Sequence, residues 1–579
     1  MVKHLIFWVC LIWTGASAAA DRNAVPDFAL IDHDGRFHQL SRHIDQRLVV
    51  LMTYQPGCQT SHRVLPEIVS LQRRYRDAPV EFQVLVVDSE QTRESLSALA
   101  AELETDVSFL LDSSQLVAEA LEFTHAGEVL VINPGNLQVL YRGGVGLYQD
   151  DAVQQGLAAN LPGMTSHLHY LIHSVLRDEP FIEDTMPLRG DVLVFDRLEE
   201  VRSRDISYQD DVAPILIERC VDCHRVNGMA PWVMEDHLMI QGWSRMIRET
   251  LLTRRMPPGQ IDYAYADHYD DVNHISDEEM MVLIEWIEAG APAGDLQDDP
   301  LEALDGNDST WELGEPDLVL EFPEHQIPAT GVLDYMFVPI ELNLTEDRWV
   351  SAYAFDVDNK AALHHVILYT QDARQRRQNA SRGGSRTNFG GYAPGREHVT
   401  LGSDNGILLS RDMRLMVQFH YTTIGREVTD RTRLGLYFHD TPPANAMVRT
   451  AIMSGDFLIP PGERDYPVMA ETVISEDSYL HSFAPHMHYR GRYISFRAEY
   501  PDGTTESLLS IPNFQNHWQM VYRLKEPVFL PGGTRIVAEG GFDNSRYNPL
   551  NPDPERAVGW GDQIWDEMFL TWLRISEAP

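Results

Sequence analysis

The stretch that most constrains the fold is His481–Gly491, which reads HSFAPHMHYRG. It alternates in character and is rich in aromatics, and on a β-strand residues i and i+2 project from the same face. His486 and His488 would then point two imidazoles into one space, as a bound copper or zinc ion requires. With 23 histidines in the chain, one such pair is expected by chance. The pattern therefore predicts a strand here, and a metal site only in combination with other residues.

Other residues supply that combination. The adjacent pair His364 and His365, and then His420 in MVQFHYTT, precede the strand, and Met568 in WDEMFLTWL follows it. This ordered set resembles the copper type II, ascorbate-dependent monooxygenases, the family of peptidylglycine α-hydroxylating monooxygenase and dopamine β-monooxygenase, over roughly residues 314–575. The resemblance implies two copper ions, one held by His364, His365 and His420 and the other by His486, His488 and Met568.

The ligand types suit copper. Three imidazoles fit a copper ion that alternates between Cu(I) and Cu(II) and passes electrons, whereas a thioether is a soft ligand that favours Cu(I), the form that must meet dioxygen. Zinc rarely takes a methionine ligand. We therefore expect the site with Met568 to be catalytic and the other site to supply electrons. The alternative is that these histidines are ordinary core or surface residues.

Two departures from the family bear on the substrate. Peptide-amidating members carry an arginine two residues before the first histidine of HxH, and this chain has Ala484 there. They also carry a tyrosine four residues after the methionine ligand, where this chain has Trp572. Of the two substrate classes, small organic molecule or peptide, we therefore expect an organic molecule with an activated C–H bond.

The 579 residues predict several domains. After Trp311 the chain reads as short strands broken by Pro, Gly and Asp, which is typical of β-sandwiches. We expect two all-β jelly-roll sandwiches, at 313–445 and 446–579, after an acidic linker at 297–312.

Residues 24–165 alternate between strands and helices. Apolar runs at 47–54, 82–90 and 107–112 and a closing hairpin at 128–144 predict a mostly parallel sheet covered on both faces. This order resembles an α/β thioredoxin-like domain of the redoxin type, with Cys58 at the strand-to-helix turn where that family keeps its reactive cysteine. A helix N-terminus lowers a thiol pKa, so Cys58 is a candidate redox thiol. The second cysteine of a CxxC pair is replaced by Ser61, which excludes a dithiol cycle and favours a structural or docking role.

Residues 166–203 form a linker or extension. It contains His167, His169 and His173, of which the last two would share a helix face. We expect an ordinary solvated helix here, with a surface metal site as the alternative.

Residues 204–296 predict an all-α cytochrome c-like domain. The segment CVDCH, Cys220–His224, has the spacing of c-type haem attachment, in which two thiols bond to the porphyrin and the histidine ligates the iron. The sixth ligand should be a methionine, and Met256 in RRMPPG is the best candidate, as in the axial-methionine loop of class I-type cytochromes c, with Met229 and Met234 as rivals. Ser276 and Glu279 predict a capping box that opens a final helix.

The N-terminal segment, the cysteine count and the net charge restrict the cellular location and the possible partners. Residues 1–20 have a basic start, an apolar run and a small-residue end, which predicts a secretory signal rather than a membrane span. We expect a periplasmic or secreted protein of a bacterial envelope, since only Cys58, Cys220 and Cys223 remain after the signal. The net charge of −41 argues against nucleic acid as a partner.

The sequence thus predicts an exported, multidomain copper monooxygenase with two copper ions and one covalent haem c. It would hydroxylate a C–H bond with O2 and take electrons from an ascorbate-like reductant or a periplasmic redox protein, through the fused haem. The alternatives are a non-catalytic electron-transfer or copper-binding protein and a thiol redox protein acting through Cys58.

Overall fold

The computed structural model describes residues 23–148, 163–181, 185–226, 228, 230–270, 272, 274–304, 311, 313–371, 387–393, 397–518 and 520–578. The predicted signal at 1–20 and the candidate ligand Met229 lie outside these ranges. The chain divides into two compact units, one made mainly of residues up to Val194 and one made mainly of Phe195–Pro579. Within the described ranges, none of the helices combines the length and the apolar composition needed to cross a bilayer.

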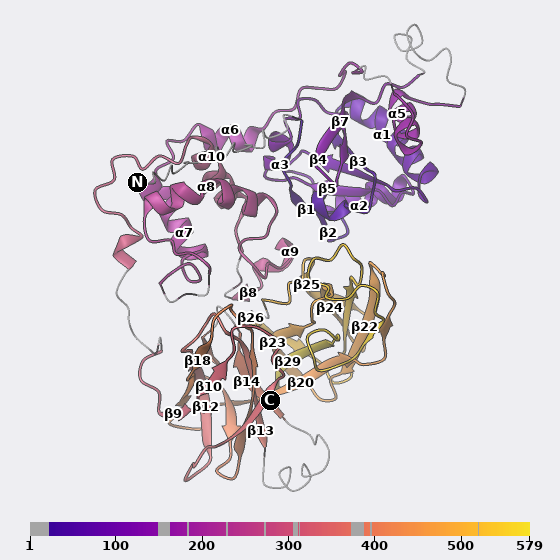
Figure 1. Ribbon diagram of the computed structural model, residues 1–579. Coiled ribbons are helices and arrows are strands. Elements are labelled where there is room, and N and C mark those ends of the chain that lie inside the picture. Colours follow the sequence, from indigo (N-terminus) through magenta and orange to yellow (C-terminus); the bar gives the residue numbers. More distant parts are fainter. Residues whose placement is uncertain are drawn as a thin grey trace, which may run out of the picture. The chain divides into compact units, whose positions relative to one another are not determined.

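The first unit is built on one five-stranded sheet in the order β5-β4-β3-β6-β7 (Figure 1). Strands β3, β4 and β5 run parallel, and β6 and β7 close the sheet as an antiparallel hairpin, as the continuous apolar runs predict. The bounds are β3 Leu48–Tyr54, β4 Val80–Val86, β5 Ser108–Leu111, β6 Glu128–Asn133 and β7 Gln138–Gly144. The short strands β1 Ala29–Ile31 and β2 Phe37–Gln39 form a sheet of their own, and Ala29–His38 is grouped with the second unit.

Helices cover this sheet and share its core. Every residue of β3 is buried, and side chains of the helices pack against it, for example Val64 of α1 and Leu96 of α2. The helices are α1 Gln59–Arg74, α2 Arg93–Glu102, α3 Leu116–Ala120 and α5 His167–Leu176.

Helix α5 is not the solvated helix that the sequence predicted. His167 and His169 are 1% and 0% exposed, and Leu168 belongs to the core of the sheet. The sequence pattern missed this because histidine reads as polar, whereas an imidazole that meets aromatic rings such as Tyr75 and Tyr141 can be buried.

The second unit begins with short helices. These are α6 Asp196–Arg202, α7 Ala213–Arg219, α8 His237–Leu252, α9 Tyr263–Ala266 and α10 Asp277–Glu288. The predicted capping box is confirmed, since Ser276 and Glu279 each bond the other's backbone N–H at the start of α10. A two-residue strand, β8 Tyr269–Asp270, pairs with β26 and ties the helical segment to the β-region.

The remainder is all-β. One half encloses its core between the four-stranded sheet β11-β17-β13-β14 and the strands β9, β12, β16 and β19. Its bounds are β9 Leu318–Glu321, β10 His325–Ile327, β11 Met336–Glu341, β12 Arg348–Asp356, β13 Leu363–Gln371, β14 Thr387–Tyr392, β15 His398–Thr400, β16 Asn405–Leu409, β17 Arg414–Tyr421, β18 Val428–Asp430 and β19 Arg433–Phe438.

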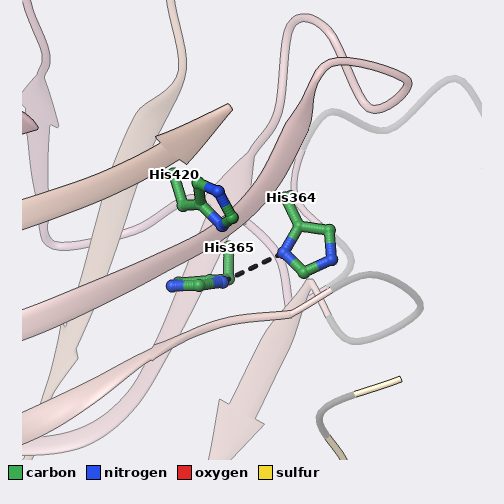
Figure 2. Close-up of side chains that lie close together, drawn as sticks. All are labelled: His364, His365 and His420. Atoms are coloured by element: carbon green, nitrogen blue, oxygen red, sulfur yellow. Dashed lines mark hydrogen bonds between the residues drawn. The ribbon is translucent and has the colours of Figure 1, made fainter. Parts of the chain in front are cut away.

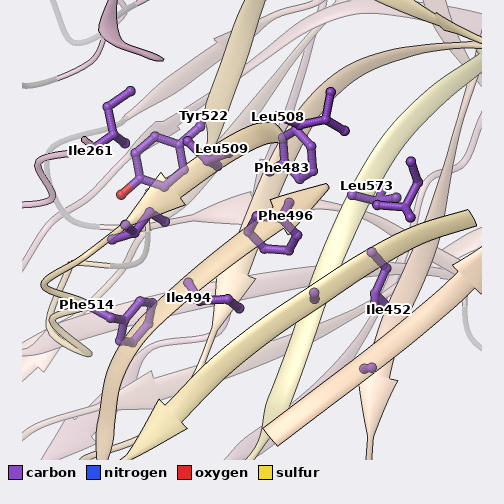
Figure 3. Close-up of a cluster of buried hydrophobic side chains, with 14 of the residues drawn as sticks. Ile261, Ile452, Phe483, Ile494, Phe496, Leu508, Leu509, Phe514, Tyr522 and Leu573 are labelled. Atoms are coloured by element: carbon purple, nitrogen blue, oxygen red, sulfur yellow. The ribbon is translucent and has the colours of Figure 1, made fainter. Parts of the chain in front are cut away.

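The other half encloses a second core between the sheet β22-β27-β24-β25 and the strands β26, β23, β29 and β20, with Phe483, Phe496 and Leu573 at its centre (Figure 3). A short parallel pairing of β16 with β20 joins the two halves into one ten-stranded sheet. Its bounds are β20 Asn445–Ser454, β21 Leu458–Ile459, β22 Tyr466–Val473, β23 Ser478–His486, β24 Gly491–Glu499, β25 Thr505–Ile511, β26 Tyr522–Leu530, β27 Arg535–Phe542, β28 Val558–Gly559 and β29 Phe569–Glu577.

Candidate metal centre

Three of the predicted ligands form one cluster, on strands β13 and β17. His365 and His420 are direct cross-strand partners, and the pairing shifts register between Leu363 and His365. Successive residues of a regular strand face opposite sides, and the irregularity is what lets His364 join its neighbour. The ring centroids lie 4.9 to 5.3 Å apart (Figure 2).

The nitrogen atoms of this cluster are spaced as metal ligands are. One nitrogen from each of the three rings can be chosen so that all lie within 4.8 Å of one another, and the Nδ1 atoms of His364 and His365 are 3.1 Å apart. Two nitrogens bound to one ion at about 2.0–2.1 Å are separated by roughly 3 Å. Buried nitrogens of His364 (Nε2) and His420 (Nδ1) have no hydrogen-bond partner. Because buried polar atoms are normally paired, these orphan nitrogens suit the ligand set of a metal ion.

Burial keeps these imidazoles neutral. It lowers the pKa of His364 to about 3 and of His420 to about 4, and it moves the pKa of His365 well below its ordinary value, with the neighbouring histidines adding to the effect. Neutral imidazole is the form that binds a metal, so the cluster is ready to bind without releasing protons near neutral pH.

The second predicted pair lies at the end of β23. The rings of His486 and His488 are 5.0 Å apart. The backbone N–H of His488 donates to Glu567 Oε2 at 3.0 Å, and its Nδ1–H donates to the carbonyl of Asp566 at 3.2 Å. This second bond fixes the tautomer that leaves Nε2 with a lone pair, and that buried atom has no partner. Burial lowers the pKa of His488 to about 3.

Strand pairing brings Met568 to the same place. His486, the last residue of β23, pairs with Leu570 of β29, and Met568 stands two residues before Leu570 in the chain. Met568, His486 and His365 line one cavity of 500 Å³. Two residues of the second predicted site, His486 and Met568, therefore line the same cavity, and the ring of His488 lies next to that of His486.

The two triads are neighbours rather than separate pockets. The rings of His365 and His486 have centroids 6.4 Å apart, although the sequence suggested two distinct sites. The sequence pattern orders the ligands along each strand but says nothing of how the ends of β13 and β23 face each other. The result is one cluster of five imidazoles with Met568 on the wall of the adjoining cavity.

Several residues at the centre were missed or left as weak candidates. The ring of Tyr335 lies 4.7 Å from that of His420 and 5.8 Å from that of His365, and no sequence signal marked it. The ring of His517 lies 6.0 Å from that of His364. Glu567, the glutamate of the DEM segment that ends at Met568, is fully buried and accepts the backbone N–H groups of His488 and Arg490.

The CxxCH segment follows α7. Cys220 and Cys223 are free thiols, and burial raises their pKa values to about 12 and about 11. The Nδ1–H of His224 donates to the carbonyl of Trp232 at 3.1 Å, which orients the ring and leaves Nε2 as the ligand atom. Two unpaired thiols followed by an oriented, buried imidazole are the donor set that a covalent haem requires. Met256 is half-buried in the loop after α8.

Cys58 lies at the N-cap of α1, where the redoxin pattern places it, but it is covered. The side chain is 2% exposed, and Sγ accepts the backbone N–H of Asp191 at 3.4 Å. The backbone of Asp191 also bonds Ala126, so the segment around Asp191 runs across the thiol. Ser61, which replaces the second cysteine, donates to carbonyls of Gln55 and Cys58.

Comparison with known proteins bears on the N-terminal domain. Residues 22–139 match the AhpC/TSA family model. Solved structures with similarity include an uncharacterized conserved protein from Geobacillus kaustophilus (23% identity, 29% of this chain and 88% of that one, TM-score 0.25) and a thiol:disulfide interchange protein DsbE from Chlorobium tepidum (18%, 27% and 96%, TM-score 0.22). A further one is the peroxidoxin BcpB from Mycobacterium tuberculosis (19%, 20% and 80%, TM-score 0.18). No curated protein matched. With its sheet order, the family match makes residues 22–139 a thioredoxin-like domain of the redoxin type.

Proposed function

We propose that this protein is an exported, copper-dependent monooxygenase that hydroxylates a C–H bond of an organic substrate. The observation that carries the proposal is the convergence of ligands that are far apart in sequence, with His365, His486 and Met568 on the wall of one cavity. Three partnerless buried nitrogens in the same cluster, on His364, His420 and His488, support a metal site over a structural histidine core.

His364, His365 and His420 would hold one copper ion, and His486, His488 and Met568 the other. Copper bound there supplies one-electron redox chemistry and the activation of dioxygen. The protein's own contribution is to keep the imidazoles of His364, His365, His420 and His488 neutral by burial. It also fixes the orientation of His488 through the carbonyl of Asp566. Because Glu567 binds the backbone on both sides of Tyr489, the HxH turn is held in place before any ligand arrives.

The cavity beside Met568 would bind the substrate. Its wall includes Leu570, Trp572 and Pro485, which offer apolar surface to an organic body. Ala484 also lines it, and a small side chain there leaves space where an arginine would place a charge. The lining beside Met568 therefore supports an organic substrate whose reacting carbon is not next to a carboxylate, unlike that of a glycine-extended peptide.

Cys220 and Cys223 would attach a haem whose iron His224 and Met256 would hold, and that haem would supply one-electron transfer from an outside donor. The donor would be an ascorbate-like reductant or a redox protein of the periplasm. Rapid mixing of haem-reduced, copper-loaded protein with oxygen should show haem reoxidation in the wild type. The same measurement on His365→Ala should show a large slowing, and equal rates would exclude this route.

The main test is hydroxylation. Copper-loaded protein should consume oxygen in proportion to hydroxylated product, and His486→Ala should abolish both while leaving haem attachment intact. Tyr479→Ala, on β23 away from the cluster, is the matched control. Copper binding without any product from a broad panel of organic substrates would instead support a non-catalytic electron-transfer or copper-binding protein.

A thiol redox function is the second candidate, favoured by the match of residues 22–139 to the AhpC/TSA family. It predicts that Cys58→Ser removes peroxide or disulfide reduction while removal of copper has no effect. The covered position of Cys58 argues against it as the main activity.

A further inference from the structure

Strand β29 presents two different faces. Phe569, Thr571 and Leu573 are at most 1% exposed, and Phe569 and Leu573 belong to the core shown in part in Figure 3. The alternate residues Met568, Leu570 and Trp572 line the 500 Å³ cavity, and Arg574 lines an adjoining cavity of 990 Å³. One face of a single strand thus runs from the candidate catalytic site, over apolar side chains, to an arginine.

A second arginine, on the neighbouring strand β20, lies next to Arg574. Arg449 of β20 and Arg574 of β29 are direct cross-strand partners, an arrangement that is destabilising for like charges. Arg574 is only 5% exposed and donates to the carbonyl of Phe389, and Arg449 donates to Asn388 Oδ1. These acceptors are neutral, so they orient the guanidinium groups without balancing their charge.

No carboxylate balances the pair within the described part of the chain. Carboxylates such as Glu397 and Asp222 line the larger cavity, but none forms an ion pair with Arg449 or Arg574. Burial and the neighbouring Arg574 lower the pKa of Arg449 to about 9, and only the phenols of Tyr353 and Tyr369 oppose this. The Nε of Arg449 is buried and has no hydrogen-bond partner. Two adjacent cations, Arg574 buried and Arg449 half-buried, are costly without a counter-ion unless a ligand supplies the anion.

Arg449 also lines both cavities, so the two meet at its side chain. We propose that Arg449 and Arg574 form a binding site for a carboxylate at the end of the cavity that begins at His486 and Met568. Arginine suits this role because its planar fork matches a carboxylate and can bond it through two N–H groups.

The cavity also defines the rest of the ligand. The chain takes six residue steps from Met568 to Arg574, which is about 20 Å at 3.3 Å per residue of strand. Between them lie Leu570 and Trp572, so the body of the ligand should be long and apolar, as in a straight-chain carboxylic acid. That this acid is the substrate rests on the proposed monooxygenase function, whereas the binding site itself does not.

A carboxylate could come from two sources. One is a free apolar acid, and the other is the propionate groups of a haem attached to Cys220 and Cys223, because Arg219 and Asp222 of that segment line the larger cavity. The chemistry at Arg449 and Arg574 is the same in both cases, and the two sources are separated by removing the haem.

The experiment measures dodecanoate binding by calorimetry on the metal-free, full-length protein. Dodecan-1-ol serves as the neutral comparison, and Arg449→Met and Arg574→Met are compared with Arg535→Met, an exposed arginine paired with Glu471. We expect each cavity variant to weaken dodecanoate about 10- to 100-fold, the range of a charged hydrogen bond, and to affect dodecan-1-ol far less. Arg449→Lys should restore part of the affinity.

Thermal unfolding gives a second readout. If the two arginines bind a carboxylate ligand, Arg574→Met should raise the Tm of the ligand-free protein, because it removes a buried charge that has no counter-ion. Dodecanoate should raise the Tm of the wild type only. A lower Tm in the free variant together with unchanged dodecanoate affinity would overturn the proposal.

The Cys220→Ser/Cys223→Ser protein, which cannot attach haem, distinguishes the sources. Equal dodecanoate affinity with and without haem supports a free acid, and binding only to the haem-free protein supports the propionates. Dodecanoate binding to both forms, with no oxygen consumption by the copper-loaded enzyme, would support this site while refuting the proposed function. No binding to either form, with no effect of either arginine, refutes the site.

Discussion

Acidification provides the sharpest test of the imidazole cluster. His420 and His488 are 5% and 1% exposed, and burial lowers their pKa values from 6.5 to about 4 and about 3. The folded pKa values lie below the unfolded ones, so between pH 6.5 and 4 the unfolded state binds more protons. Stability is therefore lost as the pH falls through this window.

The size of the loss follows from the shifts. A pH of 5.0 lies about 1.5 units below the unfolded pKa of each imidazole and above its folded pKa. The folded state therefore loses about 2 kcal/mol of stability per imidazole between neutral pH and pH 5.0. The pair together gives at most about 4 kcal/mol, since the two sites interact and their titrations are coupled. This is a large share of the ~5–15 kcal/mol that stabilises a typical domain.

The assay is native-state hydrogen exchange on the metal-free protein at pH 7.5 and 5.0, corrected for intrinsic exchange and followed on peptides of β13 and β23. His420→Asn and His488→Asn should each remove about 2 kcal/mol of the pH-dependent loss, whatever they do to stability at pH 7.5. His173→Asn, on α5, is the control and should leave the loss in β13 and β23 unchanged. If both cluster variants keep the full pH dependence of the wild type, the imidazoles are not buried as neutral groups and the reasoning fails.

Three other predictions concern copper binding by His486, the packing of Phe483 in its core and the reactivity of the Cys58 thiol. Wild-type protein should bind two equivalents of copper and His486→Ala one, measured by metal analysis after dialysis; two equivalents in the variant would remove His486 from the ligand set. Phe483→Ala should lower the free energy of unfolding by about 3–5 kcal/mol, measured by urea denaturation, because it opens a cavity in the core of the second β-half; a loss below 1 kcal/mol would contradict that packing. Cys58 should react with a maleimide at least about 100-fold faster in urea than in the native protein, read by mass spectrometry, because it is buried beneath Asp191; similar rates would show an open thiol.

Part of the candidate site could be predicted from sequence because short motifs, the pair His364–His365 and the HxH of His486 and His488, mark these residues directly. The HxH spacing places His486 and His488 on one face, and the residues near Cys58 and Ser276 carry local signals of a strand-to-helix turn and a helix cap. No such local signal marks Tyr335, His517 or the pair Arg449 and Arg574. Each of these residues becomes a candidate only because it lies next to a residue that is distant in the chain.

The sequence by itself determined the succession of α/β, helical and all-β segments, because that succession depends on local periodicity and spacing. Only the tertiary structure decided that α5 is buried, that a segment covers Cys58, and that the two imidazole groups touch. The physical reason is that burial and proximity depend on which strands pair and which faces meet. The pairing of β20 with β29 sets two arginines side by side, and no pattern within either strand records it.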